Sequence, residues 1–242
     1  MLTRVGYPKP GKHYLQALLY TPMGRLRAFR QKQGRQHKTE EFRKVNVLMK
    51  VPALRDGSFT LAESIAILLY LAQKFKTPDH WYPSDLQKRA RVDEYLSWQH
   101  ANIRQLVSSP CQVLLPILTG QPLSAEKLEF LIEDLNVVLK QFEEKFLQDK
   151  PFIAGSEVSL ADLVALVELM QPVGAGYNLF EERPKLAEWR RRVEEAVGKE
   201  LFQEAHEGIM NIKNLTSLVP TSLLRLAIDR YSQFISHVTF LS

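Results

Sequence analysis

The stretch VPALRDGSFTLAESIAILLYLAQKF, residues 51–75, decides the fold. It holds two short strand-like runs, VPAL at 51–54 and SFTL at 58–61, and between them Asp56–Gly57, a dipeptide typical of two-residue hairpin turns. Residues 64–75 form a helical pattern that is apolar on most faces, which favours packing of a helix against a sheet. We therefore predict a β-hairpin followed directly by a helix.

Glu63 and Ser64 stand where that helix begins. Residues of this kind can be there only to cap the helix. The free N–H groups and the dipole of a helix N-terminus also favour a carboxylate, to which a Ser hydroxyl adds a hydrogen bond. The Glu carboxylate can hold an ammonium group beside it, so the zwitterionic head of an amino acid would satisfy both residues. The two interpretations stay open at this point.

The chain beyond this unit is helical. The segment KTPDHWYPSDL, residues 76–86, carries two prolines and no periodicity, which is typical of a linker and marks a domain boundary. Helical patterns follow over residues 86–106, 124–147, 157–173 and 183–197. Strands and helices in separate blocks indicate an α+β protein whose larger second half is all-helical.

The pattern at 157–173 also predicts how its helix begins. Ser159 is the expected N-cap, and Asp162 three residues later reaches back in the manner of a capping box. Val158 and Leu163 are placed as the hydrophobic staple. In the next helical pattern Pro184 lies in the first turn, where its missing N–H costs nothing.

Composition excludes several classes of protein. The 242-residue chain, with 45% hydrophobic and 24% charged residues, is ordinary for a globular protein. Its single cysteine, Cys111, excludes an intrachain disulfide or a multi-cysteine zinc site and favours a reducing compartment. The longest apolar runs are far below the roughly 20 residues of a transmembrane helix, so we expect no membrane partner. No P-loop, complete dinucleotide fingerprint or zinc-binding helix occurs.

The net charge of +5 belongs to the N-terminal arm. Residues 1–39 hold nine of the 32 basic residues and no acid, which leaves 23 basic against 27 acidic groups in the rest of the chain. Nucleic-acid binding calls for basic residues on the folded body together with aromatics or a known module, and the sequence has neither. We therefore expect no nucleic-acid partner. Such an arm can also mimic a mitochondrial transit peptide, although it lacks serine.

Three stretches, at residues 51–75, 77–100 and 159–207, resemble the theta-class glutathione transferases. The resemblance runs from about Gly34 to Asn214. It implies a thioredoxin-like N-terminal domain, of which this chain has only the part over residues 34–79. A linker over 80–87 and an all-α glutathione-transferase C-terminal domain over 88–214 would follow. It also implies a cytoplasmic homodimer that uses glutathione as co-substrate with small electrophiles and needs no cofactor or metal.

By the same resemblance, Glu63 and Ser64 bind the γ-glutamyl head of glutathione. The family's cis bond would fall between Val51 and Pro52, and the exposed N–H and C=O of Val51 would pair with the glutathione backbone like an added strand. These four residues would form the core of the glutathione site.

Two further positions match the family. His37, with Lys50 nearby, corresponds to the histidine near the glycine carboxylate of glutathione. Arg104, at the end of WQHANIR, corresponds to a helix position that lines the reacting region.

The first 33 residues depart from the family. The theta class activates the glutathione thiol with a serine in an S-x-P-x-R context, but this chain has no serine before Ser58. Thr21, followed by Pro22 and Arg25, is a loose echo of that motif and the candidate for thiol activation. Only 15 residues separate Thr21 from His37, too few for the expected helix and strand with their turns. Alternatively, residues 1–33 are an alternative first exon or a gene-model artefact.

The C-terminal tail over 215–242 is also atypical, and either a closing helix or a loose amphipathic tail fits its pattern. The sequence thus leads to a first hypothesis, a glutathione transferase that acts by thiolate attack on electrophiles. A second hypothesis is a non-catalytic glutathione-binding and dimerisation module that lacks the activating serine. A third, an all-helical interaction domain, needs the N-terminal half to be unfolded.

Overall fold

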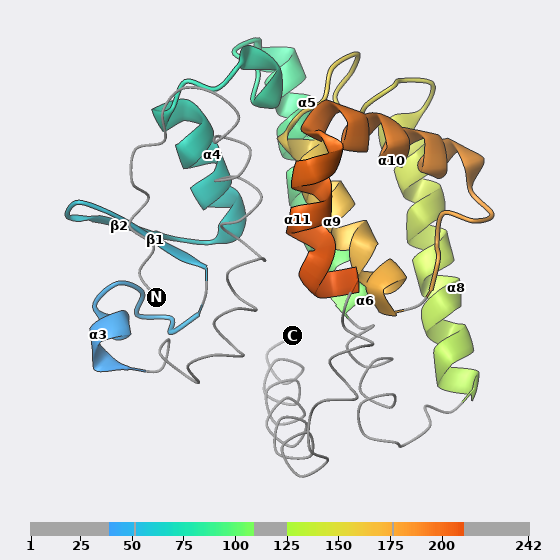
Figure 1. Cartoon of the computed structure of the whole chain (residues 1–242), viewed down its shortest axis with the longest axis horizontal. Helices are drawn as coiled ribbons and strands as arrows, with labels where there is room; N and C mark the ends of the chain where they lie inside the picture. The colour runs from blue at the N-terminus through green and yellow to red at the C-terminus, as the bar shows by residue number, and fades with distance from the viewer. Residues whose placement is uncertain (1–38, 51, 109–124, 176, 211–242) are drawn as a thin grey trace.

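The computed structural model describes residues 39–50, 52–108, 125–175 and 177–210 (Figure 1). Its first part contains α3 (Glu40–Arg43), β1 (Ala53–Asp56), β2 (Phe59–Ala62) and α4 (Ser64–Lys74). Its second part is helical: η3 (Asp79–Trp81), α5 (Leu86–Ala101), α6 (Ile103–Ser108), α8 (Ala125–Gln141), the π-helical η4 (Phe142–Leu147), α9 (Leu160–Ala175), α10 (Pro184–Val197) and α11 (Lys199–Met210). The predicted order of strands followed by helices is confirmed.

The hairpin forms as predicted, but its turn lies one residue later. Asp56 still pairs within the antiparallel ladder, so the two connecting residues are Gly57–Ser58, and the prediction of Asp56–Gly57 was wrong. Gly57 has a φ of 61°, which glycine adopts without a steric penalty. Asp56 has a reason to stay in β1, because its carboxylate there accepts a hydrogen bond from the Tyr70 hydroxyl and pairs with Lys74.

Helix α4 joins the hairpin to the helical part. It begins at Ser64, as predicted, and ends at Lys74. Its buried side chains belong to a single hydrophobic cluster that extends from Leu54 of β1 through the helices. On α4 they are Ile67, Leu68, Leu71 and Ala72. The same cluster includes Val92, Tyr95 and Leu96 of α5. The helix therefore packs against the helical part as well as against the sheet.

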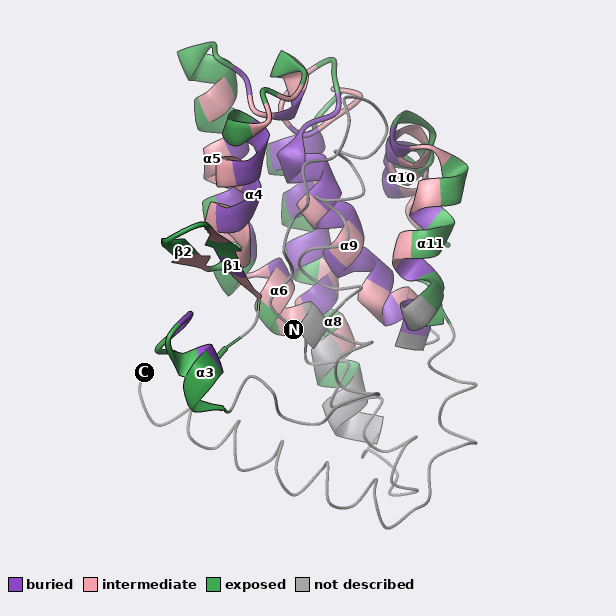
Figure 2. Cartoon of the chain, turned by 60° about the vertical axis from the view of Figure 1, so that its left-hand side comes forward, coloured by how far each residue is buried: buried purple, intermediate pink, exposed green. Residues whose placement is uncertain are grey.

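The second part is built around α9, which is buried on almost every side (Figure 2). Its sequence is apolar all round, as expected for a central helix. Helices α5, α6, α10 and α11 pack against it. The helical pattern predicted at 124–147 is confirmed over most of its length, but its last turn is π-helical. Phe142 and Phe146 in this turn are buried and pack edge-on against Tyr95 of α5.

Asp162 reaches back to Ser159 at the start of α9, as predicted. One oxygen of the Asp162 carboxylate accepts hydrogen bonds of 2.9 Å from both the backbone N–H and the hydroxyl of Ser159. Its other oxygen accepts 2.9 Å bonds from the backbone N–H of Ile153 and the indole N–H of Trp189. Burial raises the pKa of Asp162, and these donors oppose that shift. The staple residues Val158 and Leu163 are both buried.

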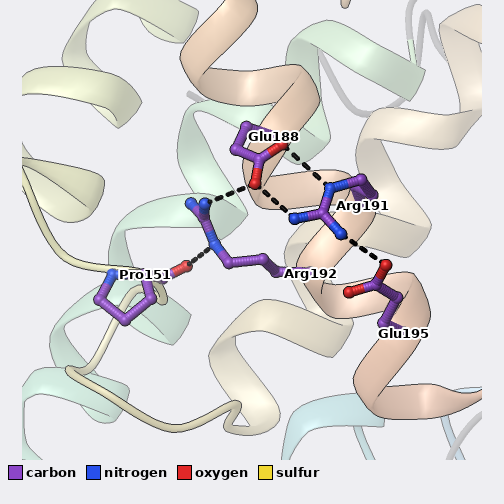
Figure 3. A network of polar contacts seen from close by, with 5 residues as sticks. All are labelled: Pro151, Glu188, Arg191, Arg192 and Glu195. Carbon is purple, nitrogen blue, oxygen red and sulfur yellow. Dashed lines mark hydrogen bonds and ion pairs between the residues drawn. The ribbon is translucent and has the colours of Figure 1, made fainter.

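Helix α10 begins with Pro184 at its first position, as predicted. Arg192 on α10 donates a 3.0 Å hydrogen bond to the carbonyl of Pro151 and a 3.2 Å bond to Glu188 (Figure 3). Arg191 bridges Glu188 and Glu195 on the exposed side of the same helix. The bond to Pro151 ties α10 to the loop that precedes α9, while the exposed ion pairs contribute little to stability.

Candidate functional site

The N-terminus of α4 presents two polar side chains that the fold itself does not use. Glu63 occupies the N-cap position, and its backbone carbonyl accepts the first helical hydrogen bond from Ile67 at 2.9 Å. The Glu63 side chain makes no capping bond and is exposed. Among the residues that the structure describes, no hydrogen bond or ion pair engages the side chain of Glu63 or Ser64. A purely capping role for Glu63 is therefore not supported by its geometry.

The backbone at Glu63 is strained. Its φ of 69° and ψ of 119° lie in a region that residues with a Cβ atom rarely adopt. Such a conformation costs about 1–3 kcal/mol and persists only where the surrounding structure imposes it. Here Ala62 ends β2 and Ser64 begins α4, so both neighbours of Glu63 are fixed by regular structure. Strain of this kind is typical of residues held for binding.

The ladder register places Pro52 near Glu63. Ala53 pairs with Ala62, so Pro52, which precedes β1, and Glu63, which follows β2, lie at the same open end of the hairpin. Pro52 is half-buried. The loop before it is closed by Asn46, whose side-chain amide donates a 2.8 Å hydrogen bond to the Lys50 carbonyl. The Lys50 side chain is left exposed at this edge.

Three of the predicted site residues lie outside the described residues: Thr21, His37 and Val51. The predicted cis bond between Val51 and Pro52 lies there too, as do the tail over 215–242 and Cys111. The structure thus brings Pro52, Glu63 and Ser64 together, with Lys50 two residues before Pro52.

Arg104 lies on a separate helix, α6. Helix α5 ends at Ala101, and the Asn102 side chain donates a 2.7 Å hydrogen bond to the Trp98 carbonyl at its end. The chain then restarts as α6, with Ile103 fully buried and the Arg104 side chain 43% exposed. Figure 2 looks onto the side of the molecule that carries both the hairpin and α6.

Arg104 has a partner, Glu168, that was not predicted from the sequence. Its Nη1 donates a 3.0 Å hydrogen bond to Oε1 of Glu168, whose side chain is only 5% exposed. The other oxygen of Glu168 accepts a 2.7 Å bond from the Gln171 amide. Burial raises the pKa of the Glu168 carboxyl, and the charge of Arg104 opposes that shift. The signal available in the sequence was an acid in the middle of an otherwise apolar stretch, LVALVELM.

Two more buried polar groups lie on α5. The hydroxyl of Tyr95 and the Oε1 of Gln99 are buried and have no hydrogen-bond partner among the described residues. Burial raises the pKa of the Tyr95 phenol well above its usual value, and the negative charges of Glu168 and Asp162 add to this. The Tyr95 phenol therefore stays neutral.

The described residues contain no group of three or more His, Cys, Asp or Glu side chains that could hold a metal ion. In the same part of the chain, no helix has the length and apolar character to cross a membrane.

Family models and curated relatives match both halves of the chain. The model of the glutathione S-transferase N-terminal domain matches residues 28–73, and that of the C-terminal domain matches residues 108–196. Glutathione S-transferase theta-1 of Gallus gallus is 66% identical over 177 residues, which cover 72% of this chain and 68% of the relative. Glutathione S-transferase theta-1 of Homo sapiens is 56% identical over 188 residues, covering 77% and 78%.

Solved structures agree with these matches. The apo form of human glutathione-S-transferase T1-1 is 56% identical and superposes with a TM-score of 0.70, covering 74% of this chain and 76% of that one. A human theta-class transferase in complex with the glutathione conjugate of 1-menaphthyl sulfate is 44% identical, with a TM-score of 0.73 and coverage of 90% and 96%. Human glutathione transferase theta-2 in complex with glutathione is 50% identical, with a TM-score of 0.72 and coverage of 81% and 84%.

Proposed function

The chain belongs to the theta class of the glutathione S-transferase family, and we propose that it conjugates reduced glutathione to small electrophiles. In this reaction the thiolate sulfur attacks an electrophilic carbon, a C–S bond forms, and the bond from carbon to the leaving group breaks. The leaving group, a halide or sulfate, departs with the bonding electrons. The observation that carries the proposal is the pair of unengaged side chains at Glu63 and Ser64, in a chain whose relatives are glutathione transferases with glutathione or its conjugate bound.

Glu63 and Ser64 bind the γ-glutamyl head of glutathione in this proposal. The Ser64 hydroxyl and the free N–H groups at the start of α4 hydrogen-bond its carboxylate, and the helix dipole favours that charge. The Glu63 carboxylate pairs with its ammonium group. The strained backbone of Glu63 supports this role, and its exposed carboxylate makes no capping bond that a ligand would have to break.

The remaining glutathione contacts extend the site in two directions. Val51, before Pro52, pairs with the glutathione backbone, and His37 and Lys50 lie by the glycine carboxylate. Each would add a hydrogen bond or an opposite charge to a group that glutathione presents. The exposed side chain of Lys50 at the edge of the hairpin supports its part in this assignment.

Thiol activation is the step for which this sequence lacks the family's serine. A hydroxyl that donates to the sulfur stabilises the thiolate and lowers the thiol pKa, which increases the amount of nucleophile at neutral pH. Thr21 is our candidate for this donor. A non-catalytic module is the alternative that the missing serine raises, but the close transferase relatives do not favour it.

The domain organisation and the cellular setting are part of the same proposal. The chain would divide into a glutathione-binding domain over 34–79, a linker over 80–87 and a helical domain over 88–214, with atypical segments over 1–33 and 215–242. It would act as a cytoplasmic homodimer on glutathione and small electrophiles, with glutathione as co-substrate and no further cofactor.

Calorimetric titration of the purified protein with reduced glutathione tests the proposal, followed by an assay of halide release from an alkyl halide. We expect binding together with halide release that needs both glutathione and protein. Binding without release would support the non-catalytic module instead, and no binding would contradict the proposal altogether. Heat-unfolded protein at the same concentration controls for the spontaneous reaction.

A further inference from the structure

We propose that Glu168 is a positioning residue that holds the Arg104 guanidinium at the reacting end of the site, where it receives the negative charge of a departing sulfate. This inference rests on the proposed function and on the family resemblance, which places Arg104 beside the reacting region. It concerns a residue of α9 that lies within the core and that acts only through Arg104.

The contact between Glu168 and Arg104 fixes one end of the Arg104 guanidinium. Glu168 is buried, and both of its carboxylate oxygens accept a hydrogen bond, from Arg104 at 3.0 Å and from the Gln171 amide at 2.7 Å. Arg104 is bonded to Glu168 through Nη1 alone, and an arginine carries five N–H donors in a rigid fork. Its side chain is 43% exposed. One part of the guanidinium is therefore fixed to the core while the rest stays accessible to a ligand.

Stability alone is a poor reason for this arrangement. The neighbours of Glu168 on α9, Leu166, Leu169 and Met170, are almost completely buried, so an apolar residue would fit the same place without the cost of desolvating a charge. Burial opposes ionisation of Glu168, as its raised pKa indicates, and Arg104 compensates in part. We therefore assign the buried Glu168 carboxylate the role of holding the half-exposed Arg104 guanidinium in place.

The placement matters for the reaction that we propose. As the carbon–oxygen bond of a sulfate ester breaks, negative charge develops on the sulfate oxygens, and a guanidinium can donate two parallel hydrogen bonds to them. Such stabilisation is most effective when the donor is already in position, because no reorganisation is then needed in the transition state. A free arginine side chain would instead lose about 1.5–2 kcal/mol of rotamer entropy on each binding event.

Glu168→Gln tests the inference because it keeps the size and one acceptor of the side chain but removes the charge. We expect kcat for 1-menaphthyl sulfate to fall about tenfold to a hundredfold, with the KM for glutathione unchanged. Arg104→Ala should lower kcat at least as much, and the double variant should equal Arg104→Ala, because Glu168 acts only through Arg104. Glu133→Gln, an exposed acid on α8, is the matched control and should leave kcat unchanged.

A second readout does not depend on turnover. In wild-type protein with ¹⁵N-labelled arginine, the Arg104 guanidinium signal should be sharp and slow to exchange with water, and Glu168→Gln should broaden it toward a free side chain. Gln171→Ala, which removes the other support of the carboxylate, should broaden it partly, and it covers the case in which Glu168→Gln does not fold.

Three outcomes would overturn the inference. The first is that Arg104→Ala lowers kcat but Glu168→Gln does not. The second is that the fold-losses of kcat in the two single variants multiply in the double variant. The third is a wild-type protein that binds glutathione and releases halide from an alkyl halide but leaves the sulfate ester intact. Absence of glutathione binding in calorimetry would instead defeat the proposed function itself, so the two failures are distinguishable.

Discussion

The indole N–H of Trp189 on α10 donates a 2.9 Å hydrogen bond to the carboxylate of Asp162 on α9. This bond joins a local capping box to a helix 27 residues further along the chain. Because the same carboxylate also binds Ser159 and the backbone of Ile153, a single buried side chain connects the start of α9, the loop before it and α10. The helical part therefore depends on Asp162 more than on any exposed ion pair described above.

Replacement of Asp162 should be severely destabilising. Asp162→Ala leaves the N–H groups of Ser159, Ile153 and Trp189 buried without an acceptor, and we expect a loss of about 4 kcal/mol in the free energy of unfolding. Urea denaturation measures it. Asp149→Ala, which removes an exposed acid near the same loop, should change stability by less than about 0.5 kcal/mol. Equal stability of the two variants would contradict the account.

His206 predicts a dependence of stability on pH. It is 3% exposed on α11, its Nδ1 donates a 2.8 Å hydrogen bond to the Phe202 carbonyl, and its Nε2 has no partner among the described residues. Burial lowers the pKa of its imidazole, and the charge of Arg190 lowers it further. The folded state thus stays neutral at a pH where the unfolded chain takes up a proton.

Stability should accordingly fall as the pH drops below the ordinary histidine value of about 6.5. Between pH 7 and 5.5 we expect His206 to account for a loss of about 1 kcal/mol. Urea midpoints of wild type and His206→Gln over this range isolate the contribution, because all other titrations are shared. His100→Gln, an exposed histidine on α5, is the control and should keep the wild-type slope. A wild-type slope in His206→Gln would contradict the prediction.

Glu63 should show a conflict between stability and binding. Glu63→Gly relieves the positive φ and should raise the free energy of unfolding by about 1 kcal/mol while it weakens glutathione binding. Glu63→Ala loses the same carboxylate but keeps the Cβ atom, so its binding should fall equally without the gain in stability. If Glu63→Gly and Glu63→Ala had the same free energy of unfolding, the backbone at this position would not be strained.

The γ-glutamyl contacts predict two further binding defects. Ser64→Ala removes one hydrogen bond to the carboxylate of glutathione, and Glu63→Gln removes the charge that faces its ammonium group. Each should raise the calorimetric Kd for glutathione about tenfold. Ser97→Ala is the matched control, because the Ser97 hydroxyl donates to the Asp93 carbonyl on the surface of α5. Unchanged affinity in Ser64→Ala would remove α4 from the site.

Sequence reasoning predicted what depends on local patterns. The hairpin, the helices and the capping box at Ser159 and Asp162 follow from spacing and residue type, and the structure contains each of them. The turn was misplaced by one residue because Asp56 is held in β1 by Tyr70 and Lys74 of a later helix. Such a contact cannot be inferred from the dipeptide alone.

The candidate site was only partly predictable for the same reason. Glu63 and Ser64 could be found because they adjoin a helix start, but the strain at Glu63 became visible only in the backbone angles. Glu168 was missed because an acid within an apolar stretch gives no sign of its partner until the fold brings Arg104 of α6 against it. The location of the thiol-activating group stays a prediction, since Thr21 lies outside the described residues.

The central claim, that this chain activates glutathione, is tested most directly by titrating the thiol of glutathione in the presence of stoichiometric protein. Thiolate absorbs in the ultraviolet, so its appearance with rising pH gives the pKa of the bound thiol. We predict a pKa clearly below that of glutathione in free solution, with Thr21→Ala moving it back toward that value. A bound thiol whose pKa equals the free value would contradict the claim, because the protein would then bind glutathione without preparing it to react.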